Sequence, residues 1–219
     1  TQDTAARIKI RSARILDDRK PARVTSIAPG IEVVKTAAVH DGKQTAVAVT
    51  LKNTGTEPVS DLPLSLELEK GRQLIEVNAK PLKYFQSHAP ALAPGEVGTW
   101  VYTSRKPVPS GGTFTARVGV PVEPPTEAGE NTTLETSGVT VVPSATGSSV
   151  VLKVHNTNDF AQYDVPVYAW AENGTVLAAA GEATVENLAP GETESVTVEL
   201  VGDPGSAEVQ ILAPATIFE

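Results

Sequence analysis

The chain has no cysteine and no methionine, and only ten of its 219 residues are aromatic. Without cysteine it has no disulfide, no thiolate metal site and no cysteine nucleophile, so disulfide-stabilised scaffolds and thiol enzymes are excluded. Long hydrophobic runs are also missing. The most apolar stretches, such as residues 176–180, are far shorter than the roughly 20 residues that a membrane-spanning helix needs.

The apolar residues that are present are mainly Val, Ala, Leu and Ile, and they bring the apolar fraction to 40% beside 17 Gly and 17 Pro. This fraction can form real cores, so a disordered chain is excluded. The length suits two domains of roughly 100 residues each. Because the chain begins at Thr1 and lacks methionine, we expect a processed or trimmed piece that a signal peptide or membrane anchor could precede.

Charge is distributed very unevenly along the chain. Residues 1–23 carry a balance of +4, whereas residues 135–219 hold a single base, Lys153, against twelve acids, a balance of −11. An acidic half of this kind repels phosphate backbones, so we expect no nucleic-acid partner. The basic N-terminal block is the one candidate for contacts with anions.

In this basic block Arg7, Lys9 and Arg11 alternate with Ile8 and Ile10. The alternation is typical of a half-buried edge strand whose charges face solvent. The same charges could instead contact an anion, a membrane surface or a partner. We expect the segment to add a strand to the first domain or to a partner's edge, so an oligomer formed by edge-strand pairing is one expected outcome.

An internal repeat organises the rest of the chain. Asn53 and Asp61 recur as Asn156 and Asp164 at an offset of 103 residues, and the pentapeptide LAPGE occurs at 92–96 and again at 188–192. The matched landmarks predict a duplicated domain. We interpret the four repeated side chains as turn residues, with each Asn bonding its own backbone two residues on.

Between these landmarks the sequence reads as strands and turns. Leucines alternate with other residues over 62–68, the pair at 173–174 is a hairpin signal, and residues 123–131 are polar and rich in proline and glutamate. We therefore predict an all-β protein with two tandem immunoglobulin-like antiparallel β-sandwiches. The predicted parts are a basic N-terminal strand or arm (1–23), a first domain (24–123), a Pro/Glu linker (124–136) and an acidic second domain (137–219).

These motifs resemble two bacterial domain families. Residues 154–158 and 160–165 with the following turns resemble the FxLYD-type immunoglobulin-like domain, with Gln162 where that pattern has leucine. Residues 51–55 and 92–96 resemble the CARDB-type, adhesion-related domain. The resemblance implies a non-catalytic module in the extracytoplasmic part of a bacterial surface, secreted or membrane-anchored protein.

Motifs of catalysis and metal binding are missing from the sequence. The three histidines show no metal-ligand spacing, and there is no nucleophile elbow, phosphate-binding loop or calcium loop. We therefore expect no enzyme activity, no cofactor and no metal site.

The aromatic residues provide the candidate partner surface. By parity, Tyr168 and Trp170 lie on the sheet face opposite to Val165 and Val167. They could cover the sheet against a loop or the other domain, or form a platform for a protein or glycan. On the second reading, alanine at both positions would weaken partner binding and leave the sheet folded. Tyr84 and Phe85 are a fainter candidate for the same role.

Three functions remain. The first is a non-enzymatic spacer and protein-interaction or adhesion module of a bacterial envelope or secreted protein, attached to a membrane only through an upstream anchor. The second is a module that binds carbohydrate or a cell-wall polymer, and the third is an accessory domain pair of a larger secreted hydrolase. An exposed coplanar aromatic pair would favour glycan binding, whereas an apolar patch without a groove would favour protein contact.

Overall fold

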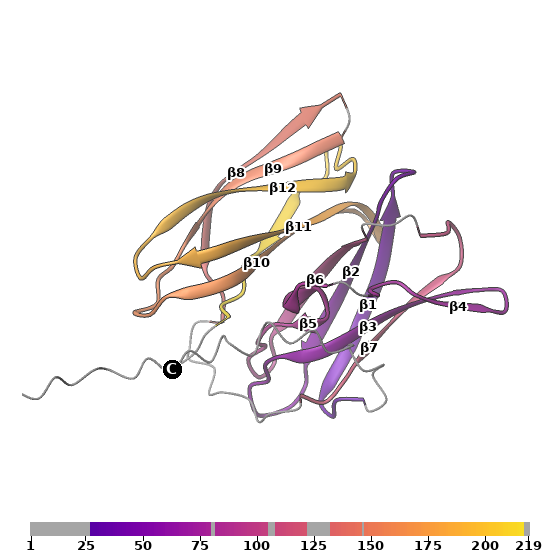
Figure 1. Cartoon of the computed structure of the whole chain (residues 1–219), viewed down its shortest axis with the longest axis horizontal. Coiled ribbons are helices and arrows are strands. Elements are labelled where there is room, and N and C mark those ends of the chain that lie inside the picture. Colours follow the sequence, from indigo (N-terminus) through magenta and orange to yellow (C-terminus); the bar gives the residue numbers. More distant parts are fainter. Residues whose placement is uncertain (1–26, 80–81, 105–107, 122–131, 146, 217–219) are drawn as a thin grey trace, which may run out of the picture.

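The computed structural model describes residues 27–79, 82–104, 108–121, 132–145 and 147–216. Within these ranges the regular elements are β-strands and one short 3-10 helix, and every strand pairing is antiparallel (Figure 1). The predicted all-β sandwich class is confirmed. The predicted N-terminal strand or arm, residues 1–23, lies outside the described residues.

The first sandwich has one sheet in the order β1-β2-β6 and a facing sheet in which β3 pairs with β4, β5 and β7. The alternating leucines of β3, Leu62, Leu64, Leu66 and Leu68, are each at most 2% exposed and belong to the first core. Ser65 and Glu67 between them are also buried. The bounds are β1 (Ile31–His40), β2 (Thr45–Asn53), β3 (Leu62–Lys70), β4 (Gln73–Glu76), the 3-10 helix η2 (Tyr84–Gln86), β5 (His88–Ala89), β6 (Val97–Ser104) and β7 (Thr113–Val118).

The second sandwich is one folded sheet in the order β13-β10-β11-β12-β9-β8. Strands β11 and β12 pair only at Ala179 with Gly202 and at Ala180 with Val201, and the sheet bends at this corner into two layers. A second hydrophobic core fills the space between the layers. The bounds are β8 (Glu135–Ser144), β9 (Gly147–His155), β10 (Gln162–Asn173), β11 (Val176–Leu188), β12 (Thr193–Gly202) and β13 (Val209–Leu212).

The linker predicted at 124–136 extends too far at its C-terminal end. Strand β8 already begins at Glu135, and Leu134 donates its backbone N–H to the Ala213 carbonyl. Residues 132–134 are thus tied to the chain after β13, and strand pairing starts before residue 137.

The two copies of the repeat make the same hydrogen bonds. In each copy a buried asparagine at the end of a strand donates its side-chain amide to a carbonyl four residues on and to the leucine carbonyl that opens the LAPGE turn. Asn53 reaches Glu57 and Leu92 at 2.8 and 3.1 Å, and Asn156 reaches Phe160 and Leu188 at 2.9 Å. The predicted turn role of both asparagines is confirmed, because each side-chain oxygen also accepts the N–H two residues on.

The aspartates repeat as well. Asp61 and Asp164 stand directly before β3 or within the start of β10, and their φ angles of 52° and 50° are in the left-handed region. Aspartate tolerates this conformation better than most residues because its short side chain can bond locally. The repeated polar residues are therefore explained by the fold and leave little reason to assign them a ligand.

Candidate interaction surface

Tyr168 is the residue that the sequence placed on an exposed face, and the structure buries it completely. Its exposed fraction is 0%, and its ring packs into the core of the first sandwich together with residues such as Leu51 and Trp100. The predicted parity is correct, since Val165 and Val167 belong to the second core and Tyr168 faces the other way. The first sandwich covers that other face, so Tyr168 offers no surface to a partner.

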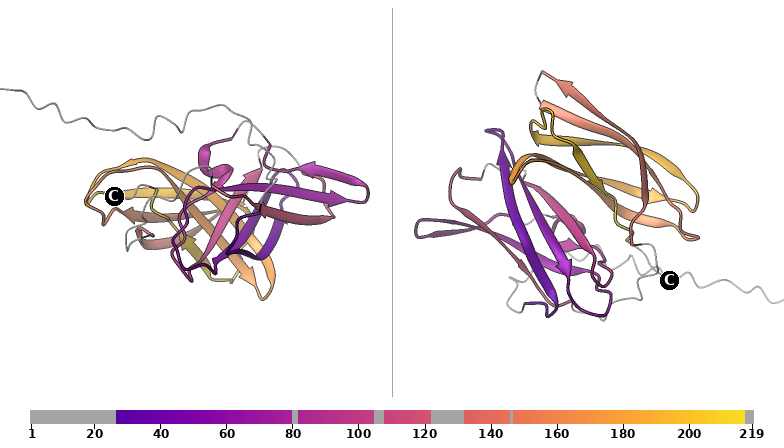
Figure 2. Two further views of the ribbon diagram at one scale, coloured as in Figure 1. Left: turned by 90° about the horizontal axis from the view of Figure 1, so that it is seen from below. Right: turned by 180° about the vertical axis from the view of Figure 1, so that it is seen from behind.

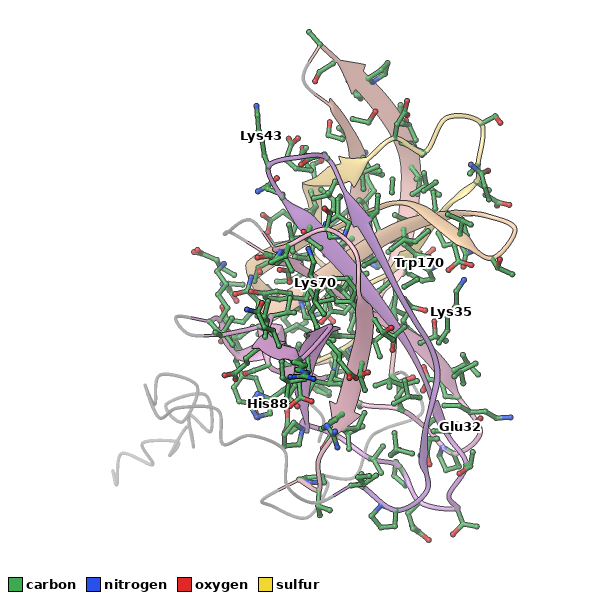
Figure 3. All side chains as sticks on the ribbon, turned by 90° about the vertical axis from the view of Figure 1, so that its right-hand side faces the viewer. Glu32, Lys35, Lys43, Lys70, His88 and Trp170 are labelled. Carbon is green, nitrogen blue, oxygen red and sulfur yellow. The ribbon has the colours of Figure 1, made fainter. Side chains whose placement is uncertain are left out.

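Trp170 shares this face and is half-buried at the edge of the same contact. Beside it on β10, Glu172 forms an ion pair with Lys35 of β1 at 2.8 Å (Figure 3). The candidate partner surface at Tyr168 and Trp170 is therefore corrected to a contact between the two sandwiches, the alternative that the sequence had left open.

The contact is a sheet-on-sheet packing of β1, β2 and β6 against β10, β11 and β12 (Figure 2). Its effect is clearest on β2, where Ala46, Val47, Ala48 and Val49 are all at most 4% exposed. A strand in a simple two-layer sandwich alternates buried and exposed residues, as β9 does. Strand β2 is buried on both faces because the second sandwich covers its outer side.

A polar bridge closes one side of the contact. The Glu182 carboxylate on β11 accepts a hydrogen bond from the Gln86 side-chain amide at 2.8 Å and from the Thr103 backbone N–H at 3.1 Å. These donors come from η2 and β6 of the first sandwich, so one carboxylate joins three elements. Burial raises the pKa of Tyr168, which pairs with Glu182 across the strands, and the charge of that carboxylate adds to the rise.

The space left inside the contact is small. A cavity of about 20 Å³ lies between Trp100, Tyr168 and Leu212, which is enough for about one water molecule. The burial of Tyr168 and of both faces of β2 is what shows that the two sandwiches pack against each other.

Tyr84 and Phe85 also have structural roles. Phe85 is 8% exposed, and its carbonyl accepts the Trp100 indole N–H at 2.6 Å. Tyr84 is half-buried and stacks on His88, with ring centroids 4.2 Å apart and planes 3° apart. Burial lowers the pKa of His88 and raises that of Tyr84. The prediction of a partner surface at Phe85 is wrong because this side chain is buried.

The basic candidates Arg7, Lys9 and Arg11 lie outside the described residues. The exposed surface that the sequence reasoning missed is strand β8. It ends the second sheet, and every residue of it is exposed or half-exposed, including Val139, Val141 and Val142 at 43%, 40% and 42%. A signal was available in the β-branched run 139–142, which begins three residues after the end of the predicted linker.

Comparing the two copies of the repeat explains why β8 is exposed. Strands β1 and β8 are equivalent first strands. Strand β1 pairs with β2, which ends at the buried Asn53, and β8 pairs with β9, which the buried Asn156 directly follows. On β1, Ala37, Ala38 and Val39 are only half-exposed and pack against the first core, and Val39 lies close to Gly202 of the second sandwich. Nothing in the described part of the chain covers the equivalent residues of β8.

Neither the protein-family models nor the curated proteins compared with this chain match it, so the CARDB-type and FxLYD-type resemblances stay predictions. Over the described ranges, the structure holds no helix with the length and hydropathy to cross a membrane. Among the same residues, no three or more His, Cys, Asp or Glu side chains are grouped so that they could hold a metal ion.

Proposed function

We propose that this chain is a non-enzymatic tandem immunoglobulin-like module of a bacterial envelope or secreted protein, acting as a rigid spacer that carries a protein-interaction edge. The observation that supports the spacer role is the complete burial of Tyr168 between the sandwiches. A buried aromatic contact, a bridging carboxylate and an ion pair resist bending between the two halves. A unit built in this way holds its two sandwiches in a fixed arrangement.

The interaction role is supported by the exposed valines of β8. Among the described residues, the large exposed apolar side chains are aliphatic except for Tyr163, and the stacked pair Trp100 and Tyr102 is buried. Sugar rings are usually bound on exposed aromatic faces, so these observations favour protein contact over glycan binding. Accessory domains of a larger hydrolase could use the same rigid pair, with the chemistry outside this chain.

Calorimetry tests the rigid pair. We expect one unfolding transition whose calorimetric enthalpy equals its van't Hoff enthalpy, because the contact couples the two cores into one cooperative unit. Two resolved transitions, one for each sandwich, would show independent domains and contradict the proposed spacer. The same measurement at several scan rates checks that the transition is reversible.

A further inference from the structure

The outer edge of β8 is an open template for another strand. Strand β8 is ten residues long, it is the last strand of its sheet, and among the described residues no strand pairs with its outer edge. Proteins usually prevent further strand pairing at such an edge with several charges, a short strand or a covering loop. Here Glu135 is the only charged residue of β8, and Pro143 stands close to its end.

We propose that this edge accepts residues 7–11 of a second copy of the chain, so that copies join by strand addition. The inference rests on the proposed role of β8 as the interaction edge. Val141 pairs across the strands with the buried Val150, so it lies on the core-facing side of the sheet, and it is 40% exposed. The added strand would place Ile8 and Ile10 on this same side. The three basic side chains would then lie on the solvent side, beside Thr140 and Val142.

Charge favours this occupant over a second β8 strand. The basic block 1–23 has a balance of +4, and the part of the chain that forms the second sandwich has a balance of −11. Pairing β8 with the β8 of another copy would bring two strongly acidic halves together, whereas a basic strand is attracted to them. The attraction also predicts that association weakens as the salt concentration rises.

The geometry points to a second copy as the donor of the strand. Ile27, which follows the basic block, pairs with Gly119 on the first sandwich. The first sandwich contacts β10, β11 and β12, while β8 lies at the far edge of the second sandwich with β9 and β13 as its neighbours (Figure 1). The chain is thus held on the first sandwich at Ile27, whereas the acceptor edge belongs to the second sandwich, so a strand donated to another copy would make a head-to-tail contact.

The test mixes two full-length variants, each with one half of the contact removed. Ile8→Asp with Ile10→Asp removes the donor, and Val141→Lys removes the acceptor by placing a positive charge on the edge. In sedimentation velocity we expect the parent to associate as its concentration rises, and each variant alone to lose at least about tenfold in association constant. An equal mixture should regain a 1:1 complex, because it contains one intact donor and one intact acceptor.

The matched control is Val176→Lys, which puts the same charge on another exposed valine of the second sandwich, at 66% exposure. It should associate like the parent, and circular dichroism melting should show Val141→Lys and Val176→Lys equally folded. A mixture that stays monomeric would overturn the proposal, as would a Val141→Lys variant that associates like the parent. If the parent is monomeric and the Ile8→Asp, Ile10→Asp variant only melts at a lower temperature, residues 7–11 pair within their own copy, and the proposal is overturned as well. These outcomes leave the calorimetric test of the spacer unaffected.

Discussion

Replacing Tyr168 with alanine is expected to lower the free energy of unfolding by about 3–5 kcal/mol, the usual range for deleting a buried aromatic side chain. The ring is 0% exposed and fills the contact between the two sandwiches, so its loss leaves a cavity that the packed sheets cannot close easily. Chemical denaturation followed by tryptophan fluorescence measures the change, since Trp100 lies beside Tyr168 in the same contact.

Tyr168→Phe is the matched control for this prediction. The Tyr168 hydroxyl is buried without a hydrogen-bond partner in the structure. The phenylalanine ring keeps the packing and removes a desolvated polar group, so stability should stay the same or rise by up to about 1 kcal/mol. If the alanine variant were as stable as the parent, Tyr168 would not be a core residue and the rigid contact would lose its main support.

Gly181→Ala should destabilise the second sandwich by about 3 kcal/mol, at the upper end of the range for overpacking. A Cβ atom at Gly181 would overlap the backbone carbonyl oxygen of Glu199, where β11 passes beneath β12 at the corner of the folded sheet. Backbone cannot move aside as a flexible side chain can, so the two strands would have to separate. Thermal melting of the variant measures the loss.

Gly174→Ala separates this clash from the general effect of adding a methyl group to a glycine. Gly174 has a φ of +64° in the β10–β11 hairpin, and a Cβ there would meet nothing within 4 Å. Its substitution should cost about 1 kcal/mol, from the left-handed backbone alone. Equal losses at the two positions would contradict the close approach of β11 and β12.

Local patterns in the sequence predicted much of the fold. The repeated asparagines and LAPGE turns predict the duplicated hydrogen bonds because each depends on residues of one copy. Parity likewise assigns Tyr168 and Trp170 to the right face of β10. It gives no information on what covers that face, since the cover comes from a contact such as that of Gln86 with Glu182, 96 residues apart.

The apolar pattern of β2 did not distinguish this covered strand from its uncovered equivalent. Residues 46–49 are continuously apolar, but the equivalent strand β9 also has a continuous apolar run at 150–152, and its Val151 is exposed in the structure. Phe85 was a candidate surface residue because it stands in a stretch without alternation, and its backbone is held by a hydrogen bond from the distant indole of Trp100.

The rigid pairing of the two sandwiches can be measured directly, because a chain without cysteine accepts two introduced labels with no background. Lys52 on β2 and Lys153 on β9 are exposed, stand on regular strands and report on different sandwiches. With spin labels on Lys52→Cys and Lys153→Cys, and dilution by unlabelled protein, double electron–electron resonance should give one narrow distance peak. The peak should broaden when Tyr168→Ala is added. A broad distribution in the parent would contradict a rigid tandem module.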